Sequence, residues 1–222
     1  YRFPYYVLAW SLTVAMLGVV TFPWAMLAYK IWHGNKAIDE EVREELLARL
    51  GCAFETAAPD ADERPVAGES APELALRLAC AKAHAVQSAY PDALIIGCDQ
   101  VAIVGDTLLG KPGSHDKAVE QLSLMSGRAV SFFTALCLLN SRTSRQQASI
   151  VPITVHMRNL TAAQIERYVR AEQPYDCAGS ARIEGLGITL VARFEGEDPT
   201  ALIGLPLIKL CEMLRNEGVE LP

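Results

Sequence analysis

The spacing of apolar positions changes several times along the chain, and these changes predict alternating helices and strands. Apolar residues recur at helical intervals in five segments, at residues 39–50, 70–89, 115–125, 161–171 and 207–215. Apolar runs bounded by Gly, Pro and Asp predict strands at residues 52–57, 93–96, 101–104, 129–139, 149–157 and 188–194. Hairpins occur among these elements, so we expect an α/β fold with a mixed, twisted sheet flanked by helices.

The clearest predicted helix spans residues 70–89. Ser70 can cap this helix, and Pro72 suits its first turn. Its apolar stripe consists of Leu74, Leu78, Ala81 and Ala85. Lys82 lies among alanines on the same helix, and the ordinary interpretation is a side chain that reaches along the helix to water.

Residues 93–112 contain the strongest candidate for chemistry. Asp99 and Gln100 follow a short apolar strand, and a turn at Gly105 and Asp106 brings Lys111 back toward them. A carboxylate at the end of a buried strand is costly unless it is paired or binds a metal ion. The stretch therefore predicts either a site for phosphate chemistry or a structural hairpin with solvated charges.

Two further polar stretches are candidates for ligand contacts. The loop at residues 58–68 carries Asp60, Asp62 and Glu63, which are either solvated or available to a hard divalent cation. Residues 173–187 are rich in glycine, so their backbone can approach a ligand closely. The charged residues of this second stretch are Asp176, Arg182 and Glu184.

The N-terminal residues 1–36 differ in character from the rest. Residues 3–29 carry no charged side chain, and aromatic residues stand near both ends of this run. About 20 apolar residues span a bilayer, so residues 5–30 are long enough for a helical membrane segment. Lys30 and Lys36 would then place residues 37–222, the second predicted domain, in the cytoplasm. A foreign or mis-joined N-terminus and a buried soluble segment remain the alternatives.

Composition narrows the function classes. The 222 residues are 51% hydrophobic and 21% charged, which is enough to bury a sizeable core. A net charge of -6 gives no electrostatic footprint for a nucleic acid polymer, although a local basic cluster and a metal ion can still bind a nucleotide. The six cysteines form no C-x-x-C pair, which indicates buried thiols in a reducing compartment.

Taken together, these stretches resemble the Maf family of nucleotide pyrophosphatases. Nine motifs occur in family order: E-L-L-A-R-L-G (45–51), A-P-D-A-D-E (58–63), A-x-x-L-A-x-x-K-A (75–83), I-G-C-D-Q-V (96–101), L-G-K-P-G-S-H (109–115), M-S-G-R (125–128), P-Y-D-C-A-G-S (174–180), E-G-L-G-I (184–188) and D-P-T-A-L-I-G-L-P-L (198–207). The resemblance covers residues 42–217. It implies a Maf-like fold and hydrolysis between the α and β phosphates of a nucleoside triphosphate.

The resemblance also implies roles for individual residues. Asp99 matches the catalytic aspartate, which accepts a proton from the attacking water or holds a metal ion. Gln100 and Glu184 match the pair typical of the 7-methyl-GTP subgroup, and a carboxylate at position 184 can accept hydrogen bonds from a guanine. The phosphates would meet Arg43, Lys82 and Lys111. A divalent cation, Mg²⁺ or Mn²⁺, would bind Asp99, Glu63 and Asp60. A homodimer and a cytoplasmic location are further expectations.

The chain departs from the family pattern near residue 40. The family begins with a strand and a phosphate-binding turn, L-A-S-x-S-P-x-R-R-E-L-L, but its serines fall here on Ile38 and Glu40, and its proline on Glu41. Arg43 is retained, and Val42 occupies a specificity position where the subgroup favours an aromatic residue. The sheet would also lack its first strand unless residues 19–31 supply one. Phe133 and Ala181 occupy positions where His and Phe are expected.

Two hypotheses follow from this mixture of matches and departures. The first is a Maf-like pyrophosphatase with an altered N-terminus and activity that is reduced or lost. The second is a membrane-tethered protein that keeps the fold for nucleotide binding or interaction, with weak or no catalysis. The retained Asp99, Lys82, Lys111 and Glu184 favour the first hypothesis, and the missing Ser-x-Ser turn favours the second.

Overall fold

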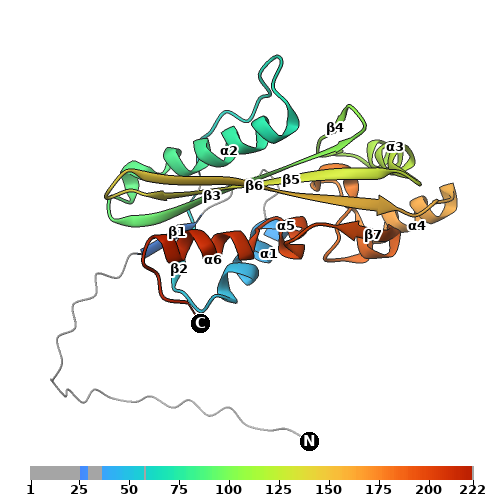
Figure 1. Ribbon diagram of the computed structural model, residues 1–222. Helices are drawn as coiled ribbons and strands as arrows, with labels where there is room; N and C mark the ends of the chain where they lie inside the picture. The colour runs from blue at the N-terminus through green and yellow to red at the C-terminus, as the bar shows by residue number, and fades with distance from the viewer. Residues whose placement is uncertain (1–25, 30–36, 58, 222) are drawn as a thin grey trace, which may run out of the picture.

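The computed structural model describes residues 26–29, 37–57 and 59–221. These residues form one seven-stranded sheet in the order β2-β1-β3-β5-β6-β7 (Figure 1). The remaining strand, β4, pairs with residues 102–104 of β3. The strands are β1 Met26–Tyr29, β2 Phe54–Glu55, β3 Ala93–Val104, β4 Thr107–Leu109, β5 Ala129–Asn140, β6 Arg145–Met157 and β7 Val191–Glu195. β1 runs parallel to β2 and β3, and the other pairs are antiparallel, so the predicted mixed sheet is confirmed.

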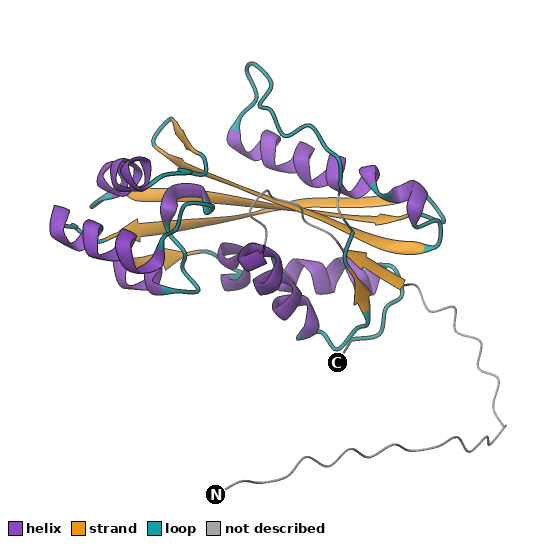
Figure 2. Ribbon diagram, turned by 180° about the vertical axis from the view of Figure 1, so that it is seen from behind, coloured by secondary structure: helices purple, strands orange, loops and turns teal. Residues whose placement is uncertain are grey.

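Helices cover both faces of this sheet. Helix α2 (Ala71–Ala85) lies on one face, and α1 (Ala37–Ala48), α5 (Pro199–Ile203) and α6 (Leu207–Asn216) lie on the other, as Figures 1 and 2 show from opposite sides. Helices α3 (His115–Met125) and α4 (Ala162–Glu172) pack together beyond the ends of the long strands. Three short 3₁₀ helices complete the described elements: η1 Gln87–Ala89, η2 Ala178–Ser180 and η3 Leu186–Leu190.

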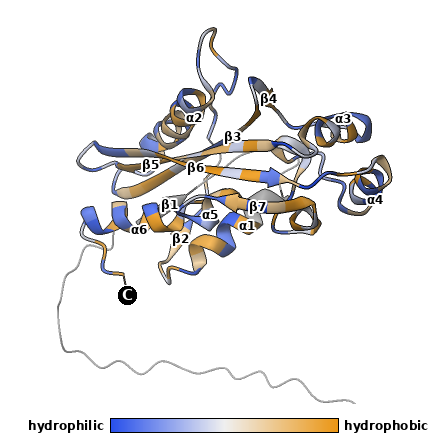
Figure 3. Cartoon of the chain, turned by 45° about the vertical axis from the view of Figure 1, so that its right-hand side comes forward, coloured by the Kyte–Doolittle hydropathy of each residue, from blue (hydrophilic) through white to orange (hydrophobic). Residues whose placement is uncertain are grey.

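The alternation of side chains along β3 divides the core between the two faces. Ile95 and Val101 pack under α2, whereas Leu94, Ile96 and Cys98 pack against α1 and α6. A third cluster joins the far ends of β3, β5 and β6 to α3 and α4. Figure 3 shows the result, with apolar colour concentrated on the central strands and polar colour on the outer helix surfaces. Both faces of β3 are therefore buried, which explains its almost continuous apolar sequence.

Gly97 lets α2 approach β3 closely. A Cβ atom at this position would lie 2.1 Å from the Ala79 carbonyl oxygen and 2.8 Å from the Ala83 nitrogen. Any larger residue would therefore push the helix away from the strand. The contact sets the height of α2 above the sheet, and with it the reach of the side chains that α2 directs toward β3.

Some predicted boundaries need correction. The two apolar runs at 93–96 and 101–104 belong to one continuous strand, because β3 pairs with β5 from Leu94 to Ile103. The strand predicted at 188–194 starts later, at Val191, after the 3₁₀ helix η3. The segment after Asp198, for which no helix was predicted, contains the short helix α5.

The N-terminal region was predicted as helical, and this is wrong for its described part. Met26–Tyr29 forms β1, in register with residues 93–96 of β3. The family pattern requires a first strand, and residues 19–31 were the candidate for it. β1 is that strand. Residues 1–25 and 30–36 lie outside the described part, so the remainder of the membrane segment predicted at 5–30 and the domain boundary at 36 stay predictions. Within the described ranges, no helix has the length and apolar character needed to cross a bilayer.

Candidate active site

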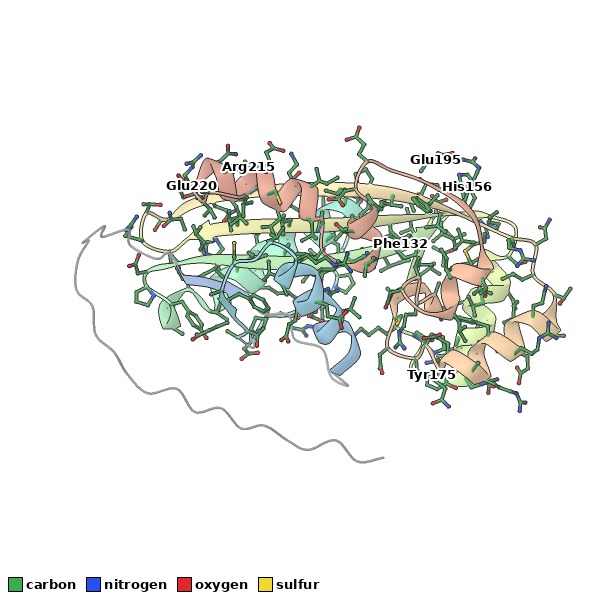
Figure 4. The ribbon with its side chains drawn as sticks, turned by 90° about the horizontal axis from the view of Figure 1, so that it is seen from below. Phe132, His156, Tyr175, Glu195, Arg215 and Glu220 are labelled. Atoms are coloured by element: carbon green, nitrogen blue, oxygen red, sulfur yellow. The ribbon has the colours of Figure 1, made fainter. Side chains whose placement is uncertain are left out.

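A cleft opens beside the middle of β3. On one edge of this strand, β1 pairs as far as Ile96 and β4 pairs from Ala102 onward. Among the described strands, none pairs with residues 97–101 on that edge. The residues that line the cleft come from six parts of the chain: Arg43, Asp99, Gln100, Lys111, Phe132, Asp176, Cys177, Ala178, Ala181, Arg182, Glu184, Leu202 and Ile203. Phe132, labelled in Figure 4, lies near the middle of the molecule, so the cleft reaches deep into the fold.

Asp99 is held at this cleft by a lysine from the helix above it. The Lys82 ammonium lies 2.6 Å from Asp99 Oδ1 and 2.9 Å from Glu63 Oε1. Lys82 is only 1% exposed and Asp99 6%, whereas the Glu63 side chain is 44% exposed. The close packing of α2 on Gly97 places the lysine directly over the aspartate. The prediction that Lys82 reaches to water is therefore wrong, because its charge is buried against two carboxylates.

The environment of Asp99 alters its acidity. Burial raises the pKa of this carboxyl above the usual 3.8, and the Lys82 ammonium opposes this shift only in part. The negative charge of Glu63 raises the pKa further, and the Arg43 guanidinium lowers it. A carboxylate with a raised pKa is a stronger base, which suits a group that accepts a proton from water.

Arg43 reaches the cleft from the opposite face of the sheet. Its side chain is buried, at 6% exposure, and packs on Gly204 at the end of α5. Gly204 has φ of +112°, and a Cβ atom there would lie 2.8 Å from Arg43 Nε. A glycine at this position therefore satisfies two demands, the left-handed backbone and the space for a guanidinium.

Gln100 faces the same side as Arg43 and uses its amide nitrogen within the protein. Its Nε2 donates to Thr134 Oγ1 at 2.9 Å, to the Ala201 carbonyl at 2.9 Å and to the Leu202 carbonyl at 3.3 Å. Thr134 Oγ1 also donates to Ala201 O, at 2.8 Å. The structure thus gives Gln100 a positioning role, since it fixes α5 as one wall of the cleft.

Asp198 fixes the other end of α5. One carboxylate oxygen accepts from the Thr200 N–H at 3.0 Å and from its hydroxyl at 2.6 Å, and the other accepts from the Ile208 N–H at 2.8 Å. Asp198 is 3% exposed. One side chain therefore caps α5 and also binds the first turn of α6.

Glu184 enters the cleft from the glycine-rich segment near α4. Its Oε1 lies 3.7 Å from Arg182 Nε, and its side chain is 24% exposed. Arg182 in turn donates from Nη1 to Glu172 Oε1 on α4, at 3.0 Å. The carboxylate at 184 thus has a surface position on a turn, in contrast to the buried Asp99 on its strand.

The structure unites most of the predicted site residues. Arg43, Asp99, Gln100, Lys111 and Glu184 line one cleft. Lys82 and Glu63 join it through their contacts with Asp99. Val42 is half-buried on α1 and is not among the lining residues, and Asp60 is exposed on its loop. The side chains of Ile38, Glu40 and Glu41 lie outside the described part.

The predicted metal ligands are only partly assembled. Within the described ranges, no group of three or more His, Cys, Asp or Glu side chains is arranged to hold a metal ion. Glu63 and Asp99 do converge, on the ammonium of Lys82. Mg²⁺ commonly needs only one or two protein carboxylates when the phosphates of a substrate and water supply the other oxygens. The donor set fits that kind of shared site and does not form a cage of its own.

Several residues at the site were not predicted. Phe132 and Ile203 line the cleft, but in the sequence each stands within an apolar segment and carries no signal of a site. Asp198 was quoted only as part of a motif, although the D-P-T sequence is a recognisable helix-capping signal. Arg182 was noted for its charge but was given no role. Glu172, at the end of α4, has no signal in the sequence that separates it from other helical glutamates.

The arrangement combines the buried carboxylate of Asp99, the cations of Arg43, Lys82 and Lys111, and the partly exposed carboxylate of Glu184. Such a set can position a polyphosphate and accept a proton from water beside it. Comparison with known proteins agrees with this chemistry, because residues 40–217 match the model of the family described as Maf-like protein. The chain belongs to the Maf family. Strand β1 lies outside the matched residues.

Individual Maf relatives are similar over most of their length. A protein of Methylobacillus flagellatus is 55% identical over 80% of this chain and 93% of the relative. One from Thiobacillus denitrificans is 57% identical over 80% and 89%, and one from Pseudomonas aeruginosa is 53% identical over 81% and 94%. Each of the three carries the name 7-methyl-GTP pyrophosphatase.

Proposed function

We propose that this Maf protein hydrolyses 7-methyl-GTP between the α and β phosphates, releasing 7-methyl-GMP and diphosphate. The names and the identity of its relatives support the substrate. The observation that carries the proposal is the placement of Asp99, which is buried, paired with Lys82, and in the same cleft as Gln100 and Glu184.

Asp99 acts as the proton acceptor. A water molecule beside its carboxylate transfers a proton to it while the water oxygen forms a bond to the α-phosphorus. The bond from that phosphorus to the bridging oxygen breaks, and diphosphate leaves with the electron pair. Lys82 holds the carboxylate at 2.6 Å, so the base is oriented before the substrate arrives.

The cations of the cleft stabilise the charge that develops on the phosphates. Arg43, on α1, and Lys111, just after β4, both line the cleft. Lys82 is already in contact with two carboxylates, so its contacts support a role in holding Asp99. Direct phosphate binding by Lys82 stays a prediction.

A divalent cation, Mg²⁺ or Mn²⁺, is part of the proposal. Glu63 and Asp99 are the carboxylates that would hold it together with phosphate oxygens, and Asp60 would contribute only through movement of its exposed loop. Bound there, the ion would supply charge neutralisation to the phosphates.

The base end of the nucleotide would meet Glu184. Its carboxylate has two oxygens, which can accept hydrogen bonds from N1–H and from the exocyclic amine of guanine. A glutamine in its place would have only one acceptor oxygen. The Gln100 nitrogen is used to hold α5, so its oxygen is the atom left for a ligand. Val42 remains a predicted specificity position. A homodimer, a cytoplasmic location and membrane attachment remain predictions as well.

The test is to incubate the chain with 7-methyl-GTP and Mg²⁺ or Mn²⁺ and to separate the products by chromatography. Products of α–β cleavage are 7-methyl-GMP and diphosphate, whereas 7-methyl-GDP and phosphate would indicate cleavage elsewhere. Asp99→Asn should lower kcat/KM by about 10²- to 10⁴-fold, because an amide does not accept the proton.

Asp92→Asn is the matched control, because Asp92 is an exposed aspartate just before the first residue of β3, with Arg142 3.8 Å away. This variant should keep wild-type activity. If the wild type and Asp99→Asn give the same background rate, the enzymatic proposal is wrong and the alternative of nucleotide binding without catalysis is favoured.

A further inference from the structure

The turn that carries Glu184 is held on both sides by one residue of α4. Glu172 Oε1 accepts a hydrogen bond from Arg182 Nη1 at 3.0 Å, and Glu172 Oε2 accepts from the Leu186 N–H at 2.8 Å. Arg182 and Leu186 stand two residues before and two residues after Glu184. The two oxygens of a single carboxylate therefore bind a side chain before the proposed base-recognition residue and a backbone N–H after it.

The backbone of this turn is shaped to receive Glu172. A Cβ atom at Gly185 would lie 2.7 Å from Glu172 Oε1, so only glycine allows the carboxylate to approach. The N–H groups of Gly185 and Gly187 both donate to the Arg182 carbonyl, at 3.2 and 2.8 Å. The turn is thus closed on itself before Glu172 binds it.

A second residue of α4 supports the same contact. The Arg182 N–H donates to Tyr168 Oη at 3.0 Å. Tyr168 and Glu172 are four residues apart, so they occupy one face of the helix. One face of α4 therefore binds both the backbone and the side chain of Arg182, and this attaches the turn to α4.

Burial and distance show how the charge of Arg182 is divided. The side chains of Arg182 and Glu172 are 13% and 10% exposed. Arg182 lies 3.0 Å from Glu172 but 3.7 Å from Glu184. The guanidinium is thus closer to Glu172 than to Glu184, and this limits how far it neutralises Glu184.

We propose that Glu172 is a positioning residue for base selectivity. It fixes the turn that carries Glu184, and it draws the Arg182 guanidinium away from the Glu184 carboxylate. This inference rests on the proposed function, since it assigns to Glu172 a part in the recognition of the guanine base. Without Glu172, Arg182 pairs with Glu184 and the carboxylate loses its ability to accept from N1–H and the exocyclic amine.

The test compares kcat/KM for 7-methyl-GTP with that for 7-methyl-ITP, which lacks the exocyclic amine. Glu172→Gln should lower the ratio of the two values about 10-fold, the size expected for one hydrogen bond to a charged group. Glu172→Gln combined with Arg182→Gln should recover part of the ratio, because the competing guanidinium is gone. Glu166→Gln is the control, since Glu166 lies on the same helix and pairs with Arg170 and His115 instead.

A second measurement does not require activity. Amide hydrogen exchange at Leu186 should speed up at least about 10-fold in Glu172→Ala, which removes the acceptor, and should stay unchanged in Glu166→Gln. Unchanged exchange together with an unchanged substrate ratio would overturn the role of Glu172. Failure of the wild type to cleave 7-methyl-GTP would overturn the proposed function instead, and the exchange at Leu186 would still decide whether Glu172 holds the turn.

Discussion

The two acidic residues of the cleft are supported in opposite ways. Asp99 lies on β3, an inner strand of the sheet, at 6% exposure, with an ammonium 2.6 Å away. Glu184 lies on a glycine-rich turn, with a guanidinium 3.7 Å away that it shares with Glu172. The first is fixed by the core of the fold, and the second by a few contacts at its margin. The position of the base therefore depends on global stability, whereas selectivity depends on local contacts.

The strongest test of this comparison is Lys82→Met. Removal of the ammonium leaves the Asp99 carboxylate buried without its nearest cation, which should lower the free energy of unfolding by about 3–5 kcal/mol. Activity should fall at least about 100-fold, because the base loses its orientation. Urea denaturation followed by circular dichroism measures the first effect, and diphosphate release measures the second.

Lys82→Met combined with Asp99→Asn is the control for charge burial. The double variant should regain part of the lost stability, since no charge is then left unpaired at Asp99. A double variant as unstable as Lys82→Met alone would show that packing of the lysine stem, and not the ion pair, is what the core requires.

The second test concerns Glu184→Gln. Because the carboxylate stands on a turn at the margin, the change should leave the free energy of unfolding within about 1 kcal/mol of the wild type. Its kcat/KM for 7-methyl-GTP should fall about 10- to 100-fold, because one charged acceptor is lost. A fall of the same size for 7-methyl-ITP would contradict a role in base recognition.

The third test uses pH and concerns Asp99. Burial raises the pKa of Asp99 above 3.8, so the folded protein binds a proton that the unfolded chain releases between 3.8 and the raised pKa. The wild type should therefore lose stability relative to Asp99→Asn as pH rises through this window. Activity should rise over the same window, because Asp99 must be deprotonated to accept a proton.

Parallel urea titrations of the wild type and Asp99→Asn, from pH 4 upward, would measure this difference. A constant gap between the two proteins across the window would show that burial does not raise the pKa of Asp99.

The smallest effect is expected at the acidic loop. Asp60→Asn should change the Mg²⁺ concentration for half-maximal activity by less than about 2-fold, because Asp60 is exposed and the described residues of its loop form no cation site. Glu63→Gln should raise that concentration more, since Glu63 is the carboxylate that shares Lys82 with Asp99. Equal effects of the two variants would place both side chains on the ion.

Most of the fold could be predicted from local signals. Helix α3 spans His115–Met125 as predicted, and Ser70, predicted as a cap, is the residue that precedes the first turn of α2. Strand β1 could be predicted only as an alternative within residues 19–31, because an apolar run fits a helix or a strand equally well and pairing with β3 decides between them. Helix α5 could not be predicted from periodicity, because it has only five residues and depends on the cap from Asp198.

The site residues that could be predicted are those that stand together in one sequence motif. Asp99 and Gln100 stand together in one motif, and Glu184 could be paired with them only through the resemblance to a family. Glu172 and the burial of Lys82 could not be predicted, because both depend on how closely two elements approach each other. That distance is set by Gly97 and Gly185, whose importance shows only when the neighbouring atoms are known.

The contact between Arg43 and Gly204 has a consequence for synthesis of the protein. It joins the first described helix to the end of α5, so one wall of the cleft needs residues from near both ends of the folded domain. A ribosome-bound chain that has emerged only through β6 would already contain Asp99 and Lys82. It would still lack α5, which is too short to persist without its partners. The Asp99–Lys82 ion pair can thus form early during translation, while the complete cleft appears only once α6 has left the ribosome.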